Sequence, residues 1–98
     1  MSLFETGTVV MTCGIRDLMF SDEHAQEVVQ SCLERHCKGD WGDLCDDDKM
    51  MNDESLEAEK KGDWTDSLFS SYETDVGKIY VITECDRSST TILLPEEY

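Results

Sequence analysis

The chain has 98 residues, of which 39% are apolar and 32% are charged, and its 23 acidic against eight basic residues give a formal net charge of −15. This length leaves room for one domain, residues 1–98, with one modest core. The charge excludes direct binding to nucleic acid or to a membrane of anionic lipid, and it favours basic partners. The plain alternative is that the acidity only keeps a small protein in solution.

The cysteines and the N-terminus indicate where the protein works. The five cysteines are odd in number and irregular in spacing, and residues 1–11 lack both the basic start and the long apolar run of a secretory signal. No stretch approaches the roughly 20 apolar residues of a membrane span. We therefore expect free thiols in a reducing cytoplasm.

The N-terminal half predicts a strand and then a helix. Residues 8–13 are β-branched and apolar, which is typical of a strand, and residues 14–20 read as a connector with at most a short helical turn. Ser21 is the expected N-cap of a helix over residues 22–38, which Gly39 ends. One apolar face runs along that helix: Ala25, Val28, Val29, Cys32 and Leu33.

The second half predicts an acidic helix followed by a meander. Residues 46–61 form the helix, although its few apolar residues predict light packing, and residues 40–66 as a whole are expected to be an acidic, mobile segment. Three strands follow, at residues 68–72, 78–84 and 90–94. The predicted fold is α+β: an antiparallel sheet of about four strands, the N-terminal strand plus the C-terminal meander, with two helices packed on one face.

The sequence Gly-Asp-Trp occurs twice, at residues 39–41 and 62–64, each time after a lysine. The flanking sequences differ, whereas a true repeat would repeat its supersecondary unit. We interpret the pair as one way of ending a helix used twice: the glycine caps, the aspartate turns the chain, and the indole packs back.

Metal sites and catalytic sites have weak support. The acids after Asp40 do not follow the spacing of an EF-hand loop. A zinc site could use Cys32, His36, Cys37 and Cys45, but a core cysteine with a surface histidine is favoured because Cys32 continues the apolar face. We expect no metal and no cofactor.

One polar cluster interrupts the C-terminal strands. Glu84, Asp86 and Arg87 could serve an enzyme, but pairing of Arg87 with Glu84 or Asp86 to fix the turn is the favoured interpretation. We therefore expect a protein that is not an enzyme.

The charge is concentrated in one segment. Residues 40–66 hold eleven acidic residues and three lysines, a net −8, which is over half of the total. Carboxylates three or four positions apart on a helix stand about 5–6 Å from one another, a spacing comparable to that of phosphates along a nucleic-acid strand. The two tryptophans could anchor an interface or could cover the core. The candidate partner-binding residues are Asp40, Trp41, Asp43, Asp46, Asp47, Asp48, Asp53, Glu54, Glu57 and Trp64.

Three stretches, GDWGDL (39–44), LFSSY (68–72) and ITECDRSSTTILLPEEY (82–98), resemble a family of short proteins carried on plasmids and integrating elements, with the pattern GDWGDL … ITExDRSxTTxLxPxEY. The chain departs from the pattern at residues 62–66, where the family has a short glycine-containing link. The family brings no catalytic residues. The resemblance implies a mobile-element setting, in which small acidic proteins often disarm host defence nucleases.

These observations lead to one functional hypothesis and one alternative. The hypothesis is an acidic inhibitor that binds a basic nucleic-acid-binding protein, such as a Cas nuclease or a restriction complex, and blocks its DNA channel by mimicking DNA charge. The alternative is an accessory or regulatory module of plasmid maintenance that binds a protein partner through the sheet and Trp41. Either a monomer or a homodimer fits, since an edge strand can pair with a second copy.

Overall fold

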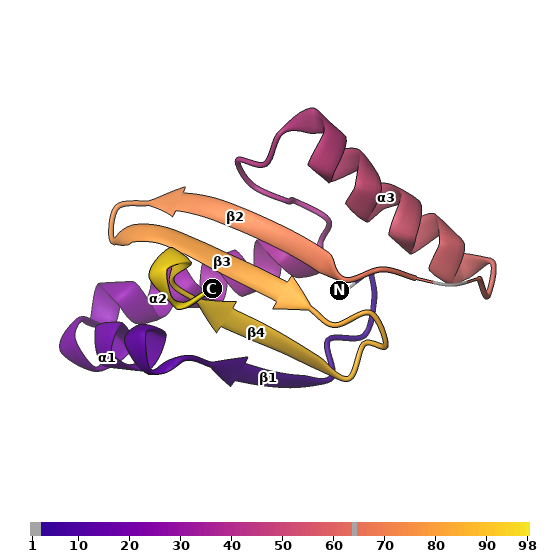
Figure 1. The fold of residues 1–98 in the computed structure, drawn as a ribbon. Coiled ribbons are helices and arrows are strands. Elements are labelled where there is room, and N and C mark those ends of the chain that lie inside the picture. The colour runs from indigo at the N-terminus through magenta and orange to yellow at the C-terminus, as the bar shows by residue number, and fades with distance from the viewer. Residues whose placement is uncertain (1–2, 64) are drawn as a thin grey trace.

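The computed structural model describes residues 3–63 and 65–98 and shows a four-stranded sheet with three α-helices (Figure 1). The α+β class is therefore confirmed. In chain order the elements are β1 (Thr8–Met11), α1 (Cys13–Ser21), α2 (Glu23–Cys37), α3 (Asp46–Lys60), β2 (Leu68–Thr74), β3 (Gly77–Thr83), β4 (Ser89–Leu93) and the 3-10 helix η1 (Pro95–Glu97).

The sheet has the strand order β1-β4-β3-β2. β2, β3 and β4 form the predicted antiparallel meander. The N-terminal strand joins its edge as predicted, but it runs parallel to β4, so the sheet is mixed. A parallel pair needs a long crossover, and here all three helices lie in the chain between β1 and the meander.

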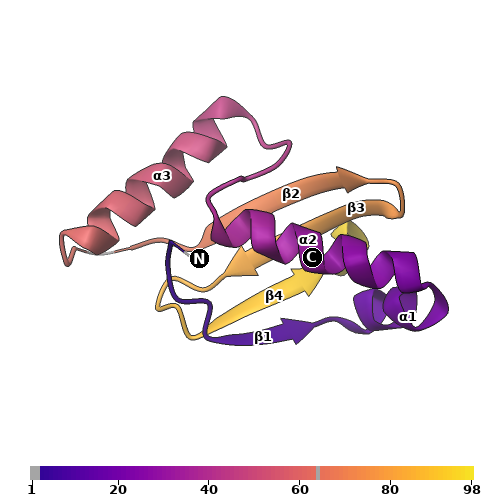
Figure 2. The ribbon, with the colours of Figure 1, turned by 180° about the vertical axis from the view of Figure 1, so that it is seen from behind.

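α1 and α2 cover one face of the sheet, as the view from behind shows (Figure 2). Two helices on one face were predicted, but the helix that accompanies α2 is α1 and not the acidic α3. Residues 13–21 form a full helix because Ile15, Leu18 and Met19 recur at helical spacing, and Ile15 is completely buried. The α2 N-cap is Asp22, whose carboxylate accepts the His24 backbone N–H, instead of the predicted Ser21.

The apolar core has two parts. The larger one lies between the sheet and the two helices and contains seven buried residues: Ile15, Val29, Cys32, Tyr72, Ile79, Val81 and Ile92. The smaller one joins Phe4, Trp41 and Leu68, with Leu44 and Leu56 at its margin. Leu56 is the α3 residue at the margin of this second core, so the apolar contact between α3 and the core is small.

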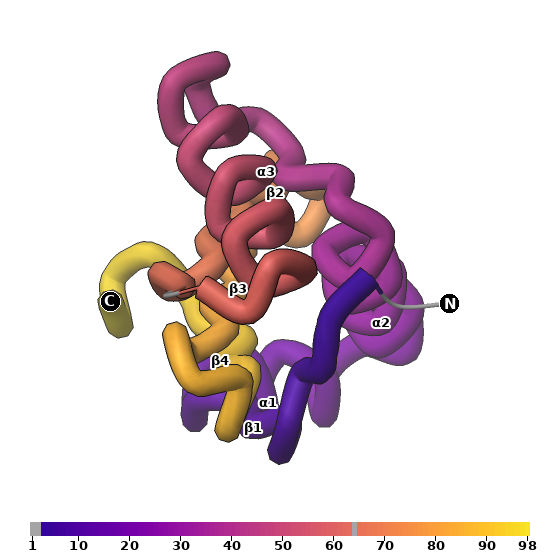
Figure 3. The backbone as a smooth tube through the Cα atoms, turned by 90° about the vertical axis from the view of Figure 1, so that its right-hand side faces the viewer, coloured from indigo at the N-terminus to yellow at the C-terminus, as the bar shows by residue number. Residues whose placement is uncertain are grey.

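α3 lies beyond β2, at the opposite edge of the sheet from β1 (Figures 1 and 3). The Asn52 side chain pairs with both backbone groups of Phe69: its amide donates to the carbonyl at 2.7 Å and its oxygen accepts the N–H at 3.3 Å. Gly42 forms a parallel bridge with Ser71, two residues further along β2 than Phe69. The β2 edge is thereby covered at these positions, which protects it from pairing with another chain.

Candidate functional site

Five acidic residues of α3 lie on the side of the helix that faces away from the sheet. At about 100° per residue, their positions fall within one arc of about 120°, opposite the buried Asn52 and Ser55. All five are exposed. We call this set the acidic face: Asp46, Asp47, Asp53, Glu54 and Glu57.

In the described part of the chain, the acidic face makes one ion pair. Glu57 has a cation within reach, the Lys60 Nζ at 3.6 Å, and Asp53 accepts the Trp41 indole N–H at 2.9 Å. Asp46 and Asp47 stand in the first turn, where the helix dipole stabilises negative charge. Met50 lies in the middle of the acidic face and is 57% exposed. The result is an apolar residue surrounded by carboxylates on a helix at the margin of the molecule.

Two other predicted acids belong to the body of the protein. The Asp40 carboxylate pairs with the Arg35 guanidinium at 2.7 Å, and this contact holds the pKa of the carboxyl below its usual value. The Asp40 backbone carbonyl also accepts the Tyr72 hydroxyl. Asp43 lies 3.5 Å from Lys78 on β3. The Asp40 carboxylate fastens the loop before α3 to α2, and the Asp43 carboxylate fastens it to β3. Both stand apart from the acidic face.

Asp48 and Glu59 are the α3 acids that face the body of the protein. Asp48 lines a groove between α3 and the sheet. The Glu59 carboxylate accepts Arg87 Nε–H at 2.7 Å. The predicted acidic segment is thus divided by its helix into an outward set and an inward set.

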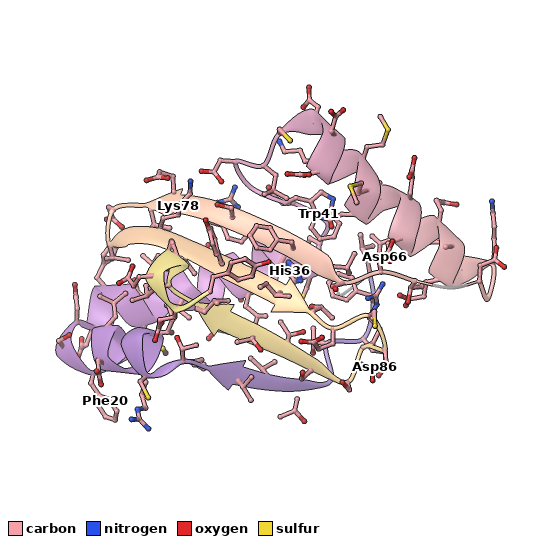
Figure 4. All side chains as sticks on the ribbon, viewed as in Figure 1. Phe20, His36, Trp41, Asp66, Lys78 and Asp86 are labelled. Carbon is pink, nitrogen blue, oxygen red and sulfur yellow. The ribbon has the colours of Figure 1, made fainter. Side chains whose placement is uncertain are left out.

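Trp41 is a core residue, only 3% exposed, with its ring against Phe4 and His36 (Figure 4). An indole buried in this way is not a surface anchor in this conformation. The alternative function, a regulatory module that binds its partner through the sheet and Trp41, would need an exposed Trp41 indole, which this conformation does not offer. Trp64, the other predicted tryptophan, lies outside the described residues.

The C-terminal ends of α2 and α3 have the same backbone geometry. Gly39 and Gly62 have φ of +82° and +76°, in the left-handed region. The next backbone N–H, from Asp40 or Asp63, reaches back five residues to a helix carbonyl at 2.9 Å in both cases. This is the glycine-capped helix end that the sequence predicts for the two Gly-Asp-Trp segments.

His36 was expected on the surface, but it is completely buried. Its Nδ1 lies 2.5 Å from the Ser70 hydroxyl and its Nε2 lies 2.9 Å from the Thr83 hydroxyl, which is 2.8 Å from the Thr90 hydroxyl. Thr90 donates to the Thr6 backbone carbonyl. Helical spacing could have found this position, because His36 extends the buried series Ala25, Val29 and Cys32.

The zinc alternative has no cluster of ligands to support it. Among residues 3–63 and 65–98, no three His, Cys, Asp or Glu side chains are grouped in a way that could hold a metal ion. Cys32 and His36 share a helix face as predicted, but both point into the core, and burial raises the pKa of the Cys32 thiol to about 11. A neutral thiol in such a place packs as a small apolar group.

Arg87 connects four parts of the chain. Its side chain is 9% exposed, and its guanidinium pairs with Glu59 of α3 and donates to the backbone carbonyls of Asp66 and Glu84. The carboxylate that pairs with Arg87 is therefore that of Glu59. The predicted pairing of Arg87 with the carboxylate of Glu84 or Asp86 is wrong. Since its donors are engaged in these contacts, Arg87 holds the β3–β4 turn and the end of α3 together.

Comparisons with known proteins add nothing to this geometry. No family model, no curated protein and no solved structure matches the chain. Within the described part of the chain, no helix has both the length and the apolar character needed to cross a bilayer.

Proposed function

We propose that the protein is a non-enzymatic inhibitor that binds a basic DNA-handling protein through the acidic face of α3. The main support for this proposal is that five carboxylates share one outward arc of a helix that lies beyond the edge of the sheet. A DNA-targeting nuclease, such as a CRISPR effector or a restriction complex, has a positively charged channel of the kind that such a surface complements. The resemblance to proteins of mobile elements gives this partner class and a setting in the bacterial cytoplasm.

The mechanism follows from charge and shape. The acidic face would enter the DNA channel, release the counterions held there and exclude the DNA. Met50, in the middle of the face, would add an apolar contact that does not weaken with salt. We propose the residues on the outward arc as the inhibitory ones, since Asp40 and Asp43 are paired with basic residues and Asp48 lines the groove on the other side of α3.

The test is a matched pair of charge-reversal variants in DNA-binding assays with a panel of purified CRISPR effectors and restriction complexes. In the first variant Asp46, Asp47, Glu54 and Glu57 become lysine, while Asp53 stays because it holds the Trp41 indole. In the control, Asp17, Glu23, Glu27 and Glu34, which are exposed on α1 and α2, become lysine. Both variants change the net charge equally, and circular dichroism checks that each is folded.

We expect the wild-type protein and the control to block DNA binding by one member of the panel and the α3 variant to lose at least about 90% of the inhibition. Inhibition should also weaken steeply as salt rises from about 0.05 M to about 0.3 M, because exposed charges are screened. Equal inhibition by the two variants, or inhibition that does not change with salt, would contradict the proposal.

A further inference from the structure

β1 forms the open edge of the sheet. In the strand order β1-β4-β3-β2, the outer edge of β2 is covered by Gly42 and by the Asn52 side chain, whereas no other described element pairs with the outer side of β1 (Figure 1). Natural sheets protect such an edge with lysine, proline, an inward-pointing charge or a bulge. The four residues of β1, Thr-Val-Val-Met, include no lysine, proline or charge, and their register with β4 has no bulge. The strand is short, but its edge is otherwise unprotected.

The pairing with β4 determines which backbone groups of β1 point outward. The N–H of Thr8 donates to a β4-side carbonyl at 3.1 Å, and the N–H of Thr12 does the same at the other end of the strand, also at 3.1 Å. Backbone groups alternate in direction along a strand, so Val9 and Met11 turn their N–H and carbonyl groups away from β4. Within residues 3–63 and 65–98, these outward groups take part in no hydrogen bond.

Two outward residues with one residue between them make this edge complementary to itself. If a second copy runs antiparallel with Val10 opposite Val10, then Val9 of each copy stands opposite Met11 of the other, and each of these pairs exchanges two backbone hydrogen bonds. All the outward backbone groups are then used. A symmetric register centred on Val9 or Met11 would instead need Gly7, whose φ is +63°, or Cys13, which belongs to α1. The register centred on Val10 is therefore the one that fits this strand.

The side chains along the open edge are apolar and exposed. Val9 packs against the larger core, so Val10 points to the face of the sheet that the helices leave uncovered, where it is 43% exposed. Met11, which is 45% exposed, shares a hollow of about 290 Å³ with Met19 and Phe20 of α1, and Phe20 is 83% exposed (Figure 4). In the symmetric register, Val9 of the second copy stands opposite Met11 and borders this hollow. Exposed apolar side chains grouped in this way are typical of a contact surface.

The distribution of charge favours a second copy as the partner. Two copies with a net charge of −15 repel one another over most of their surfaces. The two longest stretches of the chain without an acidic residue are residues 6–16 and 87–95, and they contain β1 and β4. The open edge therefore lies in the part of the sequence where two copies repel each other least. A basic partner, by contrast, is attracted to the acidic face of α3.

We propose that the protein forms a homodimer in which the β1 strands of two copies pair antiparallel about Val10. The two four-stranded sheets then join into one continuous sheet, with α1 and α2 of both copies on the same face. α3 lies at the other edge of each sheet, so the two acidic faces stand at opposite ends of the dimer. Because the paired strands are short, the dissociation constant should lie in the micromolar range. This inference is independent of the proposed function, because β1 and the acidic face lie at opposite edges.

Sedimentation velocity over the micromolar range of protein concentration, at low and at high salt, measures the association. We expect an equilibrium between monomer and dimer that shifts toward the dimer as salt rises, because screening weakens the repulsion between two anionic copies. The proposed inhibition weakens with salt, so the two proposals predict salt effects of opposite sign. A protein that stays monomeric up to the millimolar range at both salt concentrations overturns the proposal.

Val10 and Met50 provide a matched pair of variants. Both side chains are exposed, 43% and 57%, and each change to lysine reduces the negative charge equally. Val10→Lys places two like charges opposite each other at the two-fold axis and should weaken the dimer at least about tenfold. Met50→Lys reduces the general repulsion without touching β1, so it should leave the dimer unchanged or strengthen it. Equal weakening by the two changes, or weakening by Met50→Lys alone, overturns the proposal.

Disulfide trapping tests the register and does not depend on the lysine variants. The background replaces by serine the four cysteines that are not buried: Cys13, Cys37, Cys45 and Cys85. Val10→Cys brings two thiols together at the axis, where the Cα atoms of a pair without hydrogen bonds are about 4.5 Å apart, within the range of a disulfide. Thr8→Cys is the control, because the two copies of residue 8 would lie about 14 Å apart.

We expect oxidised glutathione to produce a covalent dimer from Val10→Cys and not from Thr8→Cys. Circular dichroism checks that both variants are folded. Equal cross-linking of the two variants, or cross-linking of neither, shows that the β1 strands do not pair about Val10 and overturns the proposal.

Discussion

His36 is the centre of a buried chain of hydroxyl groups, and the direction of each hydrogen bond in that chain can be worked out. Thr90 donates to a carbonyl, so Thr83 must donate to Thr90, and the hydroxyl of Thr83 can then only accept from the imidazole. The Nε2 of His36 therefore carries the proton, and Nδ1 accepts from Ser70. The neutral ring satisfies every partner, while a second proton would leave Ser70 without its acceptor.

Burial has a consequence for the charge of this residue. Removal from water, with a smaller effect from the positive charge of Arg87, lowers the pKa of His36 to about 4 from its ordinary value of 6.5. The unfolded chain therefore binds a proton at a pH at which the folded chain does not, and stability falls as the pH decreases from about 6.5 toward 4. The contribution of His24 to stability depends on pH in the opposite direction, since hydrogen bonding to Asp75 raises the pKa of His24.

We predict that the free energy of unfolding decreases by about 2 kcal/mol between pH 7 and pH 5 because of His36. Urea denaturation at the two pH values measures this loss. The His36→Gln variant, which cannot titrate, should be less stable at pH 7 but should lose much less between the two pH values. His24→Gln serves as the control and should show a decrease at least as large as the wild type, because the opposing contribution of His24 is removed. An equally steep decrease in His36→Gln would show that another group is responsible.

α1 begins through contacts between residues that lie far apart in the sequence. The backbone N–H of Gly14 in the first turn of α1 donates to the carboxylate of Glu97, 83 residues away. The same carboxylate accepts the hydroxyl of Thr12, and these hydrogen bonds lower the pKa of Glu97. The helix thus receives its N-terminal partner from η1, whereas α2 and α3 end in local glycine caps.

Gly42 and Gly62 have similar backbone conformations but different surroundings. Both have positive φ, +78° and +76°, so any other residue is strained there. A Cβ atom at Gly62 meets nothing within 4 Å, whereas at Gly42 it would lie 1.9 Å from the Ser71 carbonyl oxygen. Gly42 therefore also allows the loop to approach β2.

We predict that Gly62→Ala costs about 1 kcal/mol of stability and that Gly42→Ala costs about 3 kcal/mol or more. The second change must break the bridge to Ser71, with its two backbone hydrogen bonds, in addition to the strain. Chemical denaturation of the two variants gives the difference. Losses of equal size would mean that the loop moves away from β2 at little cost.

At the scale of the whole molecule, the net charge of −15 is distributed unevenly. The acids near the sheet have basic partners, as in the pairs Asp40 with Arg35, Asp43 with Lys78 and Glu59 with Arg87. Within residues 3–63 and 65–98, the acidic face of α3 makes one ion pair, between Glu57 and Lys60. Self-repulsion in this fold is therefore concentrated on one helix.

We predict that the melting temperature rises by several degrees as salt increases from about 0.02 M to about 0.5 M, because screening relieves this repulsion. The variant with Glu54→Gln and Glu57→Gln should show a smaller rise. A control with Glu27→Gln and Glu34→Gln on α2 removes the same charge elsewhere. If both variants respond to salt equally, the repulsion is spread over the whole surface.

The sequence by itself determined the local features of this protein. The helix 22–38, the helix 46–61, the meander and the two glycine-capped helix ends follow from apolar spacing and from residues with special backbone preferences, which act within a few positions along the chain. The α+β class follows in turn, because the meander and the apolar face of the helix that precedes it must bury their apolar sides together.

Only the tertiary structure decided where the distant residues meet. Four features depend on contacts between residues that are 12 to 81 positions apart or on how α3 is rotated. They are the parallel direction of β1, the burial of His36 and Trp41, the pairing of Arg87 with Glu59, and the division of the acidic segment into an outward and an inward set. No local pattern carries this information, since a carboxylate or an indole has the same sequence neighbours whichever way its helix faces. The free energy of packing the whole chain selects that orientation.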